Sequence, residues 1–247
     1  MEQPFLANEK IKMKLKIIFD KESINDSCVS GWGVAYLIDD KILFDTAEKA
    51  DYLIGNLKAL DVNIANIEKV VISHNHWDHR AGLMSLLELN KKIEVFACSD
   101  FLEEFEQELS GYNLKPVEAP REIAKNIHTT GCLSVNYKGS KMKEQALVLA
   151  SEKGISLISG CAHPGVLALI KRAKEMFPKS KFYSLVGGFH LIDEDERSIN
   201  YIVDEVKRTG VKNIAPGHCT GFNAVNILKA VYPGHFFDLR IGQEIEL

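Results

Sequence analysis

Three histidines and an aspartate fall within six residues, directly after a short β-branched run, Lys-Val-Val-Ile. Residues 73–79 read Ser-His-Asn-His-Trp-Asp-His. Divalent zinc prefers imidazole nitrogen and carboxylate oxygen at about 2.0–2.2 Å, and a loop that leaves a rigid strand can bring several such ligands together. A solvated polar loop is the alternative, but four potential ligands at this density favour a metal site. We expect His74 and His76 to bind one ion, and Asp78 and His79 to face a second.

Three glycine-rich turns in the last third of the chain also carry histidine or cysteine. Residues 159–165 read Ser-Gly-Cys-Ala-His-Pro-Gly, residues 187–191 read Gly-Gly-Phe-His-Leu, and residues 216–221 read Pro-Gly-His-Cys-Thr-Gly. Each turn follows an apolar run that predicts a strand. Because glycine lets a backbone approach a ligand closely, we expect these turns to complete the site.

The spacing His-x-His-x-Asp-His after an apolar strand resembles the signature motif of the metallo-β-lactamase superfamily. Residues 42–46, Ile-Leu-Phe-Asp-Thr, resemble that superfamily's first motif, whose aspartate supports the metal loop by hydrogen bonding. The resemblance implies this role for Asp45, since an outer carboxylate orients ligand imidazoles and raises their basicity. A plain turn or a helix cap is the alternative at Asp45.

The glycine-rich turns, together with Glu-Gln-Ala-Leu-Val-Leu at residues 144–149, are similar to one branch of this superfamily. The branch consists of metal-dependent hydrolases related to an archaeal methanopterin-biosynthesis enzyme of the dihydropterin-ribofuranosylaminobenzene phosphate synthase type. The resemblance covers the chain from about Gly31 to its last residue. It implies an α/β fold, the metallo-β-lactamase αββα sandwich, with two mixed β-sheets and helices on the outer faces.

The resemblance places His218 at the superfamily's last metal-binding histidine, in the site shared with Asp78 and His79. Where a bridging aspartate usually follows glycine, this chain has Gly160 and Cys161. A thiolate can bind zinc at about 2.3 Å, whereas an unbound buried cysteine behaves as a small hydrophobic residue. Both roles stay open for Cys161.

A second departure concerns the third motif, where many relatives carry histidine in a Pro-Gly-His turn. The corresponding residues 130–132 are Thr-Gly-Cys. His163 is the candidate that would complete the site of His74 and His76, and the alternative is a histidine that hydrogen-bonds the substrate or the turn. His190 is expected at the same mouth, where it would contact the substrate or transfer a proton, with a structural role as the alternative.

Apolar periodicity predicts a chain in which strands and helices alternate around a more strand-rich middle. Strands are expected near residues 14–19, 33–38, 41–44, 69–72, 93–97, 127–137, 145–149, 154–158, 181–186 and 211–215. Helices are expected near residues 49–60, 80–89, 100–109, 165–177 and 193–209. Both halves run from strand-rich to alternating, as two sheets with outer helices would. No linker-like segment divides the chain, so one domain over residues 1–247 is expected.

Composition and charge limit the kinds of partner that the chain is expected to bind. The chain is 46% hydrophobic and 26% charged, which is ordinary for a globular protein. Its net charge of −4 and pI near 6.1 offer no global positive field to nucleic acid or to an anionic membrane. We therefore expect a small-molecule substrate, and the resemblance implies an anionic or phosphorylated one. Oligomeric state is left open.

The cysteines and the apolar runs bear on the cellular compartment. Five scattered cysteines fit neither a disulfide framework nor a CxxC zinc knuckle, so all are expected to be reduced thiols. The first sixteen residues interleave charged and apolar side chains, and no window approaches about 18 consecutive apolar residues. A cytoplasmic protein that is neither exported nor membrane-spanning is the expectation.

Metal-assisted hydrolysis is the function that these features predict. Two ions about 3.5–4 Å apart can activate water and polarise a substrate oxygen, with zinc expected first and manganese or iron as alternatives. Asp78 would orient the nucleophile, and His190 would protonate the leaving group of an ester, phosphoester, lactone or amide. One alternative is a metal-binding sensor or inactive relative, which the two departures favour. Another is a di-iron redox protein, although such proteins resemble His-x-Glu-x-Asp-His where this chain has His76.

Overall fold

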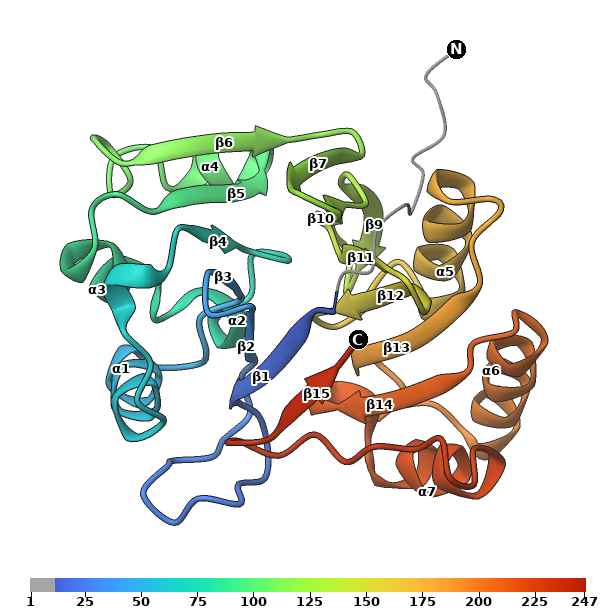
Figure 1. Ribbon diagram of the computed structural model, residues 1–247. Coiled ribbons are helices and arrows are strands. Elements are labelled where there is room, and N and C mark those ends of the chain that lie inside the picture. The colour runs from blue at the N-terminus through green and yellow to red at the C-terminus, as the bar shows by residue number, and fades with distance from the viewer. Residues whose placement is uncertain (1–11) are drawn as a thin grey trace.

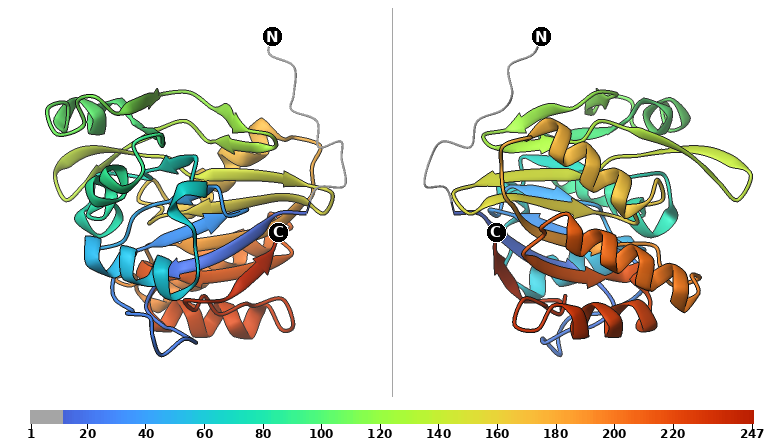
Figure 2. Two further views of the ribbon diagram at one scale, coloured as in Figure 1. Left: turned by 60° about the vertical axis from the view of Figure 1, so that its left-hand side comes forward. Right: turned by 90° about the vertical axis from the view of Figure 1, so that its right-hand side faces the viewer.

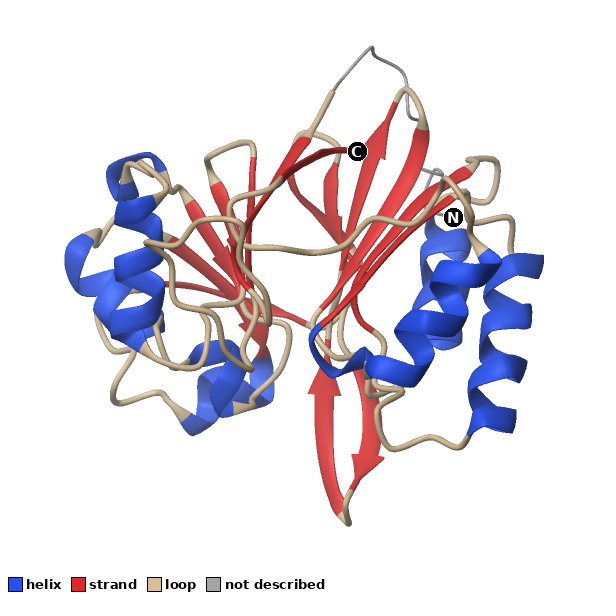
Figure 3. Cartoon of the chain, turned by 90° about the horizontal axis from the view of Figure 1, so that it is seen from below, coloured by secondary structure: helices blue, strands red, loops and turns tan. Residues whose placement is uncertain are grey.

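Four layers make up the computed structural model, which describes residues 12–247. Two mixed sheets face each other, and helices cover the outer face of each sheet (Figures 1 and 3). This arrangement is the αββα sandwich predicted from the sequence. Across residues 12–247, no helix is both long enough and apolar enough to cross a membrane.

The first sheet holds the N-terminal half of the chain and the last strand. Its strands are Lys14–Phe19 (β1), Ala35–Ile38 (β2), Ile42–Phe44 (β3), Lys69–Val71 (β4), Glu94–Cys98 (β5), Asn113–Val117 (β6) and Glu244–Glu246 (β15). They lie in the order β15-β1-β2-β3-β4-β5-β6, antiparallel up to β3 and parallel from β3 to β6. The helical segments of this half are Ala50–Ala59 (α1), Ile64–Asn66 (η1), Trp77–Arg80 (α2), Leu83–Leu89 (α3) and Ser99–Glu104 (α4).

The second sheet belongs to the C-terminal half. Its strands are Arg121–Ala124 (β7), Ile127–Thr129 (β8), Leu147–Ser151 (β11), Gly154–Ser159 (β12), Phe182–Gly188 (β13) and Asn213–Gly217 (β14). They lie in the order β14-β13-β12-β11-β8-β7, and the β12-β13 and β13-β14 pairs are parallel. The helical segments are Val166–Met176 (α5), Glu196–Arg208 (α6), His218–Thr220 (η2) and Phe222–Val231 (α7).

Strand β11 shows how the sequence dictates the layering. Leu147 and Leu149 pack between the two sheets, whereas Val148 and Ala150 pack toward the outer helices. Because side chains alternate between the two faces of a strand, an all-apolar strand must be covered on both sides. Burial of one such aliphatic side chain contributes about 1.5–3 kcal/mol, which favours the four-layer arrangement over an open sheet.

A hairpin stands outside both sheets and interrupts the strand expected over residues 127–137. Leu133–Tyr137 (β9) and Ser140–Glu144 (β10) pair with each other, and the hairpin projects from the sandwich (Figure 2). Gly131 divides β8 from β9 with a φ of +68°, and a Cβ there would lie 2.6 Å from the carbonyl carbon of Ala119. Glycine at this position therefore lets β8 stay in the sheet while β9 leaves it.

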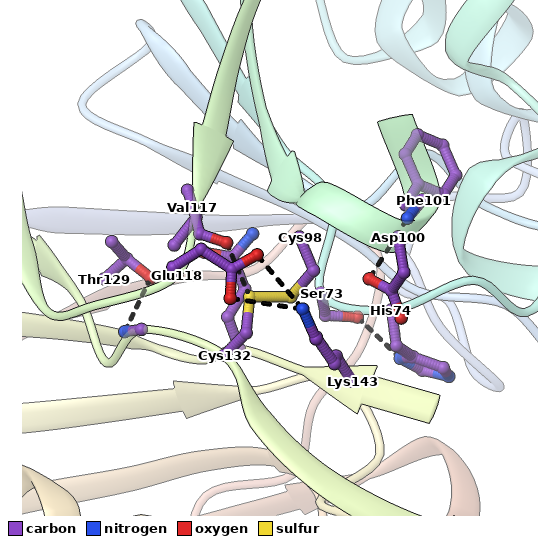
Figure 4. Close-up of a disulfide and its surroundings, with 12 residues drawn as sticks. Ser73, His74, Cys98, Asp100, Phe101, Val117, Glu118, Thr129, Cys132 and Lys143 are labelled. Carbon is purple, nitrogen blue, oxygen red and sulfur yellow. Dashed lines mark hydrogen bonds and ion pairs between the residues drawn. A yellow bond between two sulfur atoms is a disulfide. The ribbon is translucent and has the colours of Figure 1, made fainter. Parts of the chain in front are cut away.

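Cys98 and Cys132 form a disulfide, so the prediction of reduced thiols was wrong for these two cysteines (Figure 4). Their Cα atoms lie 6.0 Å apart although 34 positions separate them in the sequence. The bond ties the base of the hairpin to the end of β5, beside the ion pair between Lys143 and Glu118. The long-range return of the chain from β6 to β8 creates the pairing, and cysteine spacing carries no trace of it.

Removing this disulfide should lower the free energy of unfolding. Joint replacement Cys98→Ser and Cys132→Ser is expected to cost about 2–4 kcal/mol, because the cross-link restricts the unfolded chain. Urea denaturation under non-reducing conditions measures the difference. Cys28→Ser is the matched control, since Cys28 is a free thiol. Equal unfolding midpoints for the parent and the double variant would contradict the cross-link.

Candidate metal centre

The centre forms where strand ends from both sheets meet. Residues 74–79 follow β4 of the first sheet, whereas Cys161, His190 and His218 follow β12, β13 and β14 of the second. The last three strands are parallel neighbours, so their carboxyl ends lie along one edge. The topology thus brings side chains from distant parts of the sequence into one place.

His79 and His218 direct their Nε2 atoms at the sulfur of Cys161. The two N···S distances are 3.3 and 3.1 Å, and all three side chains are buried. Oδ2 of Asp78 lies 3.4 Å from Nε2 of His79 and 3.5 Å from Nε2 of His218. Two imidazoles, a thiol and a carboxylate form a donor set that zinc accepts.

A second group gathers around His74. Its Nε2 lies 3.0 Å from Nδ1 of His76, and the ring of His163 is centred 4.7 Å from the ring of His74 and 4.8 Å from that of His76. Two nitrogens that each bind one tetrahedral ion at about 2.0–2.1 Å would lie roughly 3.3 Å apart, so the spacing fits an ion. The structure places His163 beside the two histidines it was expected to join. Donor atoms of His74, Cys161 and His163 lie within 4.8 Å of one another.

Asp45 holds the outer side of both groups. Its Oδ2 lies 2.7 Å from Nδ1 of His79 and accepts a hydrogen bond from Oγ of Ser73, also at 2.7 Å. Because that hydroxyl donates to Asp45, it accepts from Nδ1 of His74 at 2.9 Å. His74 and His79 therefore keep their Nε2 lone pairs for the centre. Asp45 lies where an outer, supporting carboxylate was expected.

Glu144, the last residue of β10 in the hairpin, plays the equivalent part for the turn that follows β12 of the second sheet. It was not among the predicted site residues. This buried carboxylate accepts the backbone N–H groups of Cys161, Ala162 and His163 at 3.1, 2.7 and 2.8 Å. Its Oε2 also lies 2.8 Å from Nδ1 of His163, so Nε2 of that ring faces the centre. The sequence signal that could have indicated this role is an acidic residue shortly before the apolar run of β11.

His218 is fixed by two contacts that the sequence analysis also missed. Its Nδ1 donates to the backbone carbonyl of Trp32, and its N–H donates to Oδ1 of Asp20 at 3.0 Å. Asp20 is buried and also accepts the hydroxyl of Tyr36 at 2.6 Å. A backbone carbonyl has no sequence signal, whereas Asp20, directly after β1, could have been noticed as an acidic strand end.

The protonation states of His74 and His76 favour metal binding, whereas that of His79 opposes it. Burial lowers the pKa of His74 well below its ordinary value and that of His76 to about 4, so both are neutral near pH 7. Burial also lowers the pKa of His79, but the carboxylates of Asp45 and Asp78 outweigh it and raise the value to about 10. An ion must therefore displace a proton from His79.

Tyr137 and His190 lie at the mouth of the centre. The ring of Tyr137, at the end of β9, is centred 4.5 Å from that of His163, 5.2 Å from that of His190 and 5.7 Å from that of His76. His190 lies at the mouth, as expected, with its ring 4.5 Å from that of His163. Tyr137 was missed because nothing in its local sequence shows that the hairpin folds back over the site.

Beside this mouth lies a cavity of about 220 Å³. It is bounded by the loop of residues 73–79, by α4 and by the β9–β10 hairpin. Its charged and imidazole lining residues are His74, His76, Asp100, Glu104, Lys141 and Lys143. The cavity can hold part of a small polar molecule next to His74 and His76.

The remaining two histidines are not part of the centre. His128 packs on the ring of Phe177, with centroids 5.1 Å apart, and Nδ1 of His235 lies 3.0 Å from the side-chain oxygen of Asn213. The structure therefore gathers six of the eight histidines at one place. Which of the gathered side chains bind an ion stays a prediction.

Known proteins resemble this chain in sequence or in fold. Residues 33–131 match the family model described as the metallo-beta-lactamase superfamily. The chain is 30% identical to the 7,8-dihydropterin-6-methyl-4-(beta-D-ribofuranosyl)-aminobenzene-5'-phosphate synthase of Methanocaldococcus jannaschii, over 92% of this chain and 94% of that protein. The crystal structure of Tm1679, a metal-dependent hydrolase of the beta-lactamase superfamily, superposes with a TM-score of 0.81 at 28% identity, covering 95% of this chain and 99% of that one. YhfI of Bacillus subtilis, with a TM-score of 0.69 and 14% identity over 96% and 100% of the two chains, shares the fold.

Loss of the Glu144 charge should weaken metal binding. Glu144→Gln is expected to lower zinc affinity about 10- to 100-fold, because the amide no longer fixes the His163 ring as a carboxylate does. Competition with a chromogenic chelator measures the affinity. Glu152→Gln, an exposed change in the turn between β11 and β12, is the matched control. Equal affinities would show that His163 does not contribute to ion binding.

Metal affinity should also rise with pH. Below its pKa of about 10, His79 carries a proton that competes with the ion. Burial raises the pKa of the Cys161 thiol, so this group must also lose a proton before it binds an ion. Each group that must lose one proton adds about a tenfold gain per pH unit, so affinity should increase steeply between about pH 6 and 8. Chelator competition across this range tests the slope. A flat profile would exclude both groups as ligands.

Proposed function

The chain belongs to the metallo-β-lactamase superfamily, and we propose that it is a metal-dependent hydrolase that acts on a small molecule through two ions. The observation that carries the proposal is the convergence of ring nitrogens around Cys161 and Asp78, with the outward nitrogens of four rings anchored on acceptors. Structural similarity to a protein described as a metal-dependent hydrolase supports it.

The residues divide between the two ions as their distances suggest. One ion would be held by His74, His76 and His163. The other would be held by Asp78, His79 and His218, with Cys161 between the two groups. When bound, such ions lower the pKa of a coordinated water toward 7 and polarise a substrate oxygen. Imidazole and thiolate donors favour zinc, and iron or manganese are the alternatives.

Three side chains would carry the remaining chemistry. Asp78, whose pKa is lowered to about 2 by the His79 hydrogen bond despite opposing burial, is ionised and would orient the attacking water. Hydrogen bonding to Cys219 raises the pKa of His190, so this imidazole would hold a proton for the leaving group. Tyr137 would cover the reacting groups and limit access of bulk water.

We further propose an anionic or phosphorylated substrate rather than nucleic acid or a membrane surface. Lys141 and Lys143 line the cavity next to His74, and the archaeal synthase is named for a 5'-phosphate compound. Asp100 and Glu104 of α4 line the same cavity, so a molecule that combines an anionic group with hydrogen-bond donors fits best. The acidic net charge of −4 supports a small molecule.

A cytoplasmic location belongs to the same proposal, and the disulfide makes it testable. Disulfides are rare in reducing cytosol, except in intracellular proteins of hyperthermophiles. Mass spectrometry of protein taken directly from its native cells, after rapid thiol blocking, would show whether Cys98 and Cys132 are joined there.

Turnover separates the hydrolase from its rival, a metal sensor, which Cys161 at the bridging position favours. The zinc-loaded protein should hydrolyse at least one member of a panel of phosphodiesters, phosphomonoesters, lactones and thioesters. His218→Ala should lower kcat/KM by about 100-fold or more, whereas His235→Ala should leave it unchanged. Tight, stoichiometric zinc without turnover on any substrate would favour the sensor instead.

A further inference from the structure

Cys219 has no part in the proposed chemistry beyond its contact with His190, yet it lies against the centre. It follows His218 in η2 and is a buried, free thiol. Its sulfur, the sulfur of Cys161 and a ring nitrogen of His190 lie within 4.8 Å of one another. These three side chains form a third donor group, which shares Cys161 with the other two groups.

His190 has one ring nitrogen without a partner in the described part of the chain and stands in a strained turn. Its Nδ1 is buried and has no hydrogen-bond partner among residues 12–247. Its φ of +51° lies in the left-handed region, which costs a residue other than glycine about 1–3 kcal/mol and persists at sites with a function. A strained turn that holds an incompletely paired imidazole beside two thiols is a setting that a bound ion would satisfy.

Gly188 makes room for the sulfur of Cys219. A Cβ at this position would lie 2.8 Å from Sγ of Cys219 and 2.2 Å from the carbonyl oxygen of Gly160. A Cβ at position 188 would therefore collide first with the backbone of Gly160 and also with the sulfur of Cys219. Glycine at the end of β13 lets the backbone after β12 pass close by and leaves room for the sulfur of Cys219.

We propose that Cys161, His190 and Cys219 bind a third, thiophilic ion, and that this ion inhibits the enzyme. Two sulfurs and one imidazole favour zinc, cadmium or cobalt over magnesium and manganese. Each thiol that binds releases its proton to solvent, and no electron is transferred. Inhibition follows because the ion occupies the imidazole that would protonate the leaving group, and this half of the inference rests on the proposed function.

Cobalt reports thiolate binding directly. Protein loaded with two equivalents of zinc is titrated with Co(II), and sulfur-to-cobalt charge-transfer absorption is followed together with metal content after desalting. The parent should bind one further equivalent with this absorption. Cys219→Ser and His190→Ala should each lose that equivalent, whereas Cys28→Ser, a free thiol outside the three donor groups, should retain it. A parent that binds no third ion, or a Cys219→Ser variant that matches the parent, would overturn the proposal.

Activity tests the inhibitory half separately. Excess zinc should lower the parent's hydrolysis rate by at least about 100-fold, the contribution expected of a general acid. The rate of Cys219→Ser, whatever its level before zinc is added, should not fall when excess zinc is added. Equal inhibition of both proteins, or none in a parent that binds the third ion, would overturn this half. If neither protein turns over any substrate, the proposed function fails, and the cobalt titration still decides whether the third site exists. Circular dichroism melts confirm that each variant is folded.

Discussion

Asp45 brings a carboxylate into the protein interior, and the shape of the metal loop depends on how that group is satisfied. It accepts the N–H and the hydroxyl of Ser73 and faces Nδ1 of His79, each at 2.7 Å. A buried carboxylate without such partners is very unfavourable, so the three donors are held in place. Since Asp45 directly follows β3 and Ser73 lies shortly after β4, the first sheet itself fixes the direction of the histidines that follow.

The hairpin supplies a second buried carboxylate, Glu144 at the end of β10, and the centre forms where the donor groups held by Asp45 and Glu144 meet. Glu144 holds the turn of Cys161 and His163, and the next residue, Gln145, crosses to the first sheet. The side-chain nitrogen of Gln145 donates to the carbonyls of Ile72 at 2.8 Å and Phe96 at 3.3 Å. Register between the sheets and alignment of the two donor groups are thus set by adjacent residues. The contacts that pack the two sheets against each other therefore also help to assemble the site.

What the sequence could predict follows from how local each feature is. Four donors in six residues after an apolar run are a local pattern, so the loop after β4 could be predicted from the residues. The αββα fold followed from the family resemblance that this loop carries. The pairing of Glu144 with His163 and the Cys98–Cys132 bond were not, because each depends on which distant segments the topology brings together. The contact between His218 and the carbonyl of Trp32 could not be predicted, since every residue has a backbone carbonyl. Whether Cys161 binds an ion is still a prediction.

The β9–β10 hairpin forms a wall beside the donor groups that can vary in part. It adds no strand to either sheet, but its last residue, Glu144, holds the turn of Cys161 and His163, so only the outer part of the hairpin is free to vary. Yet it places Tyr137 over the histidines and lines one wall of the adjoining cavity. Exposed hairpins tolerate insertion and exchange far better than buried strands do. Changes at the tip of the hairpin can therefore alter the surroundings of the histidines, while Asp45, Glu144 and the strands that carry the donor groups stay as they are.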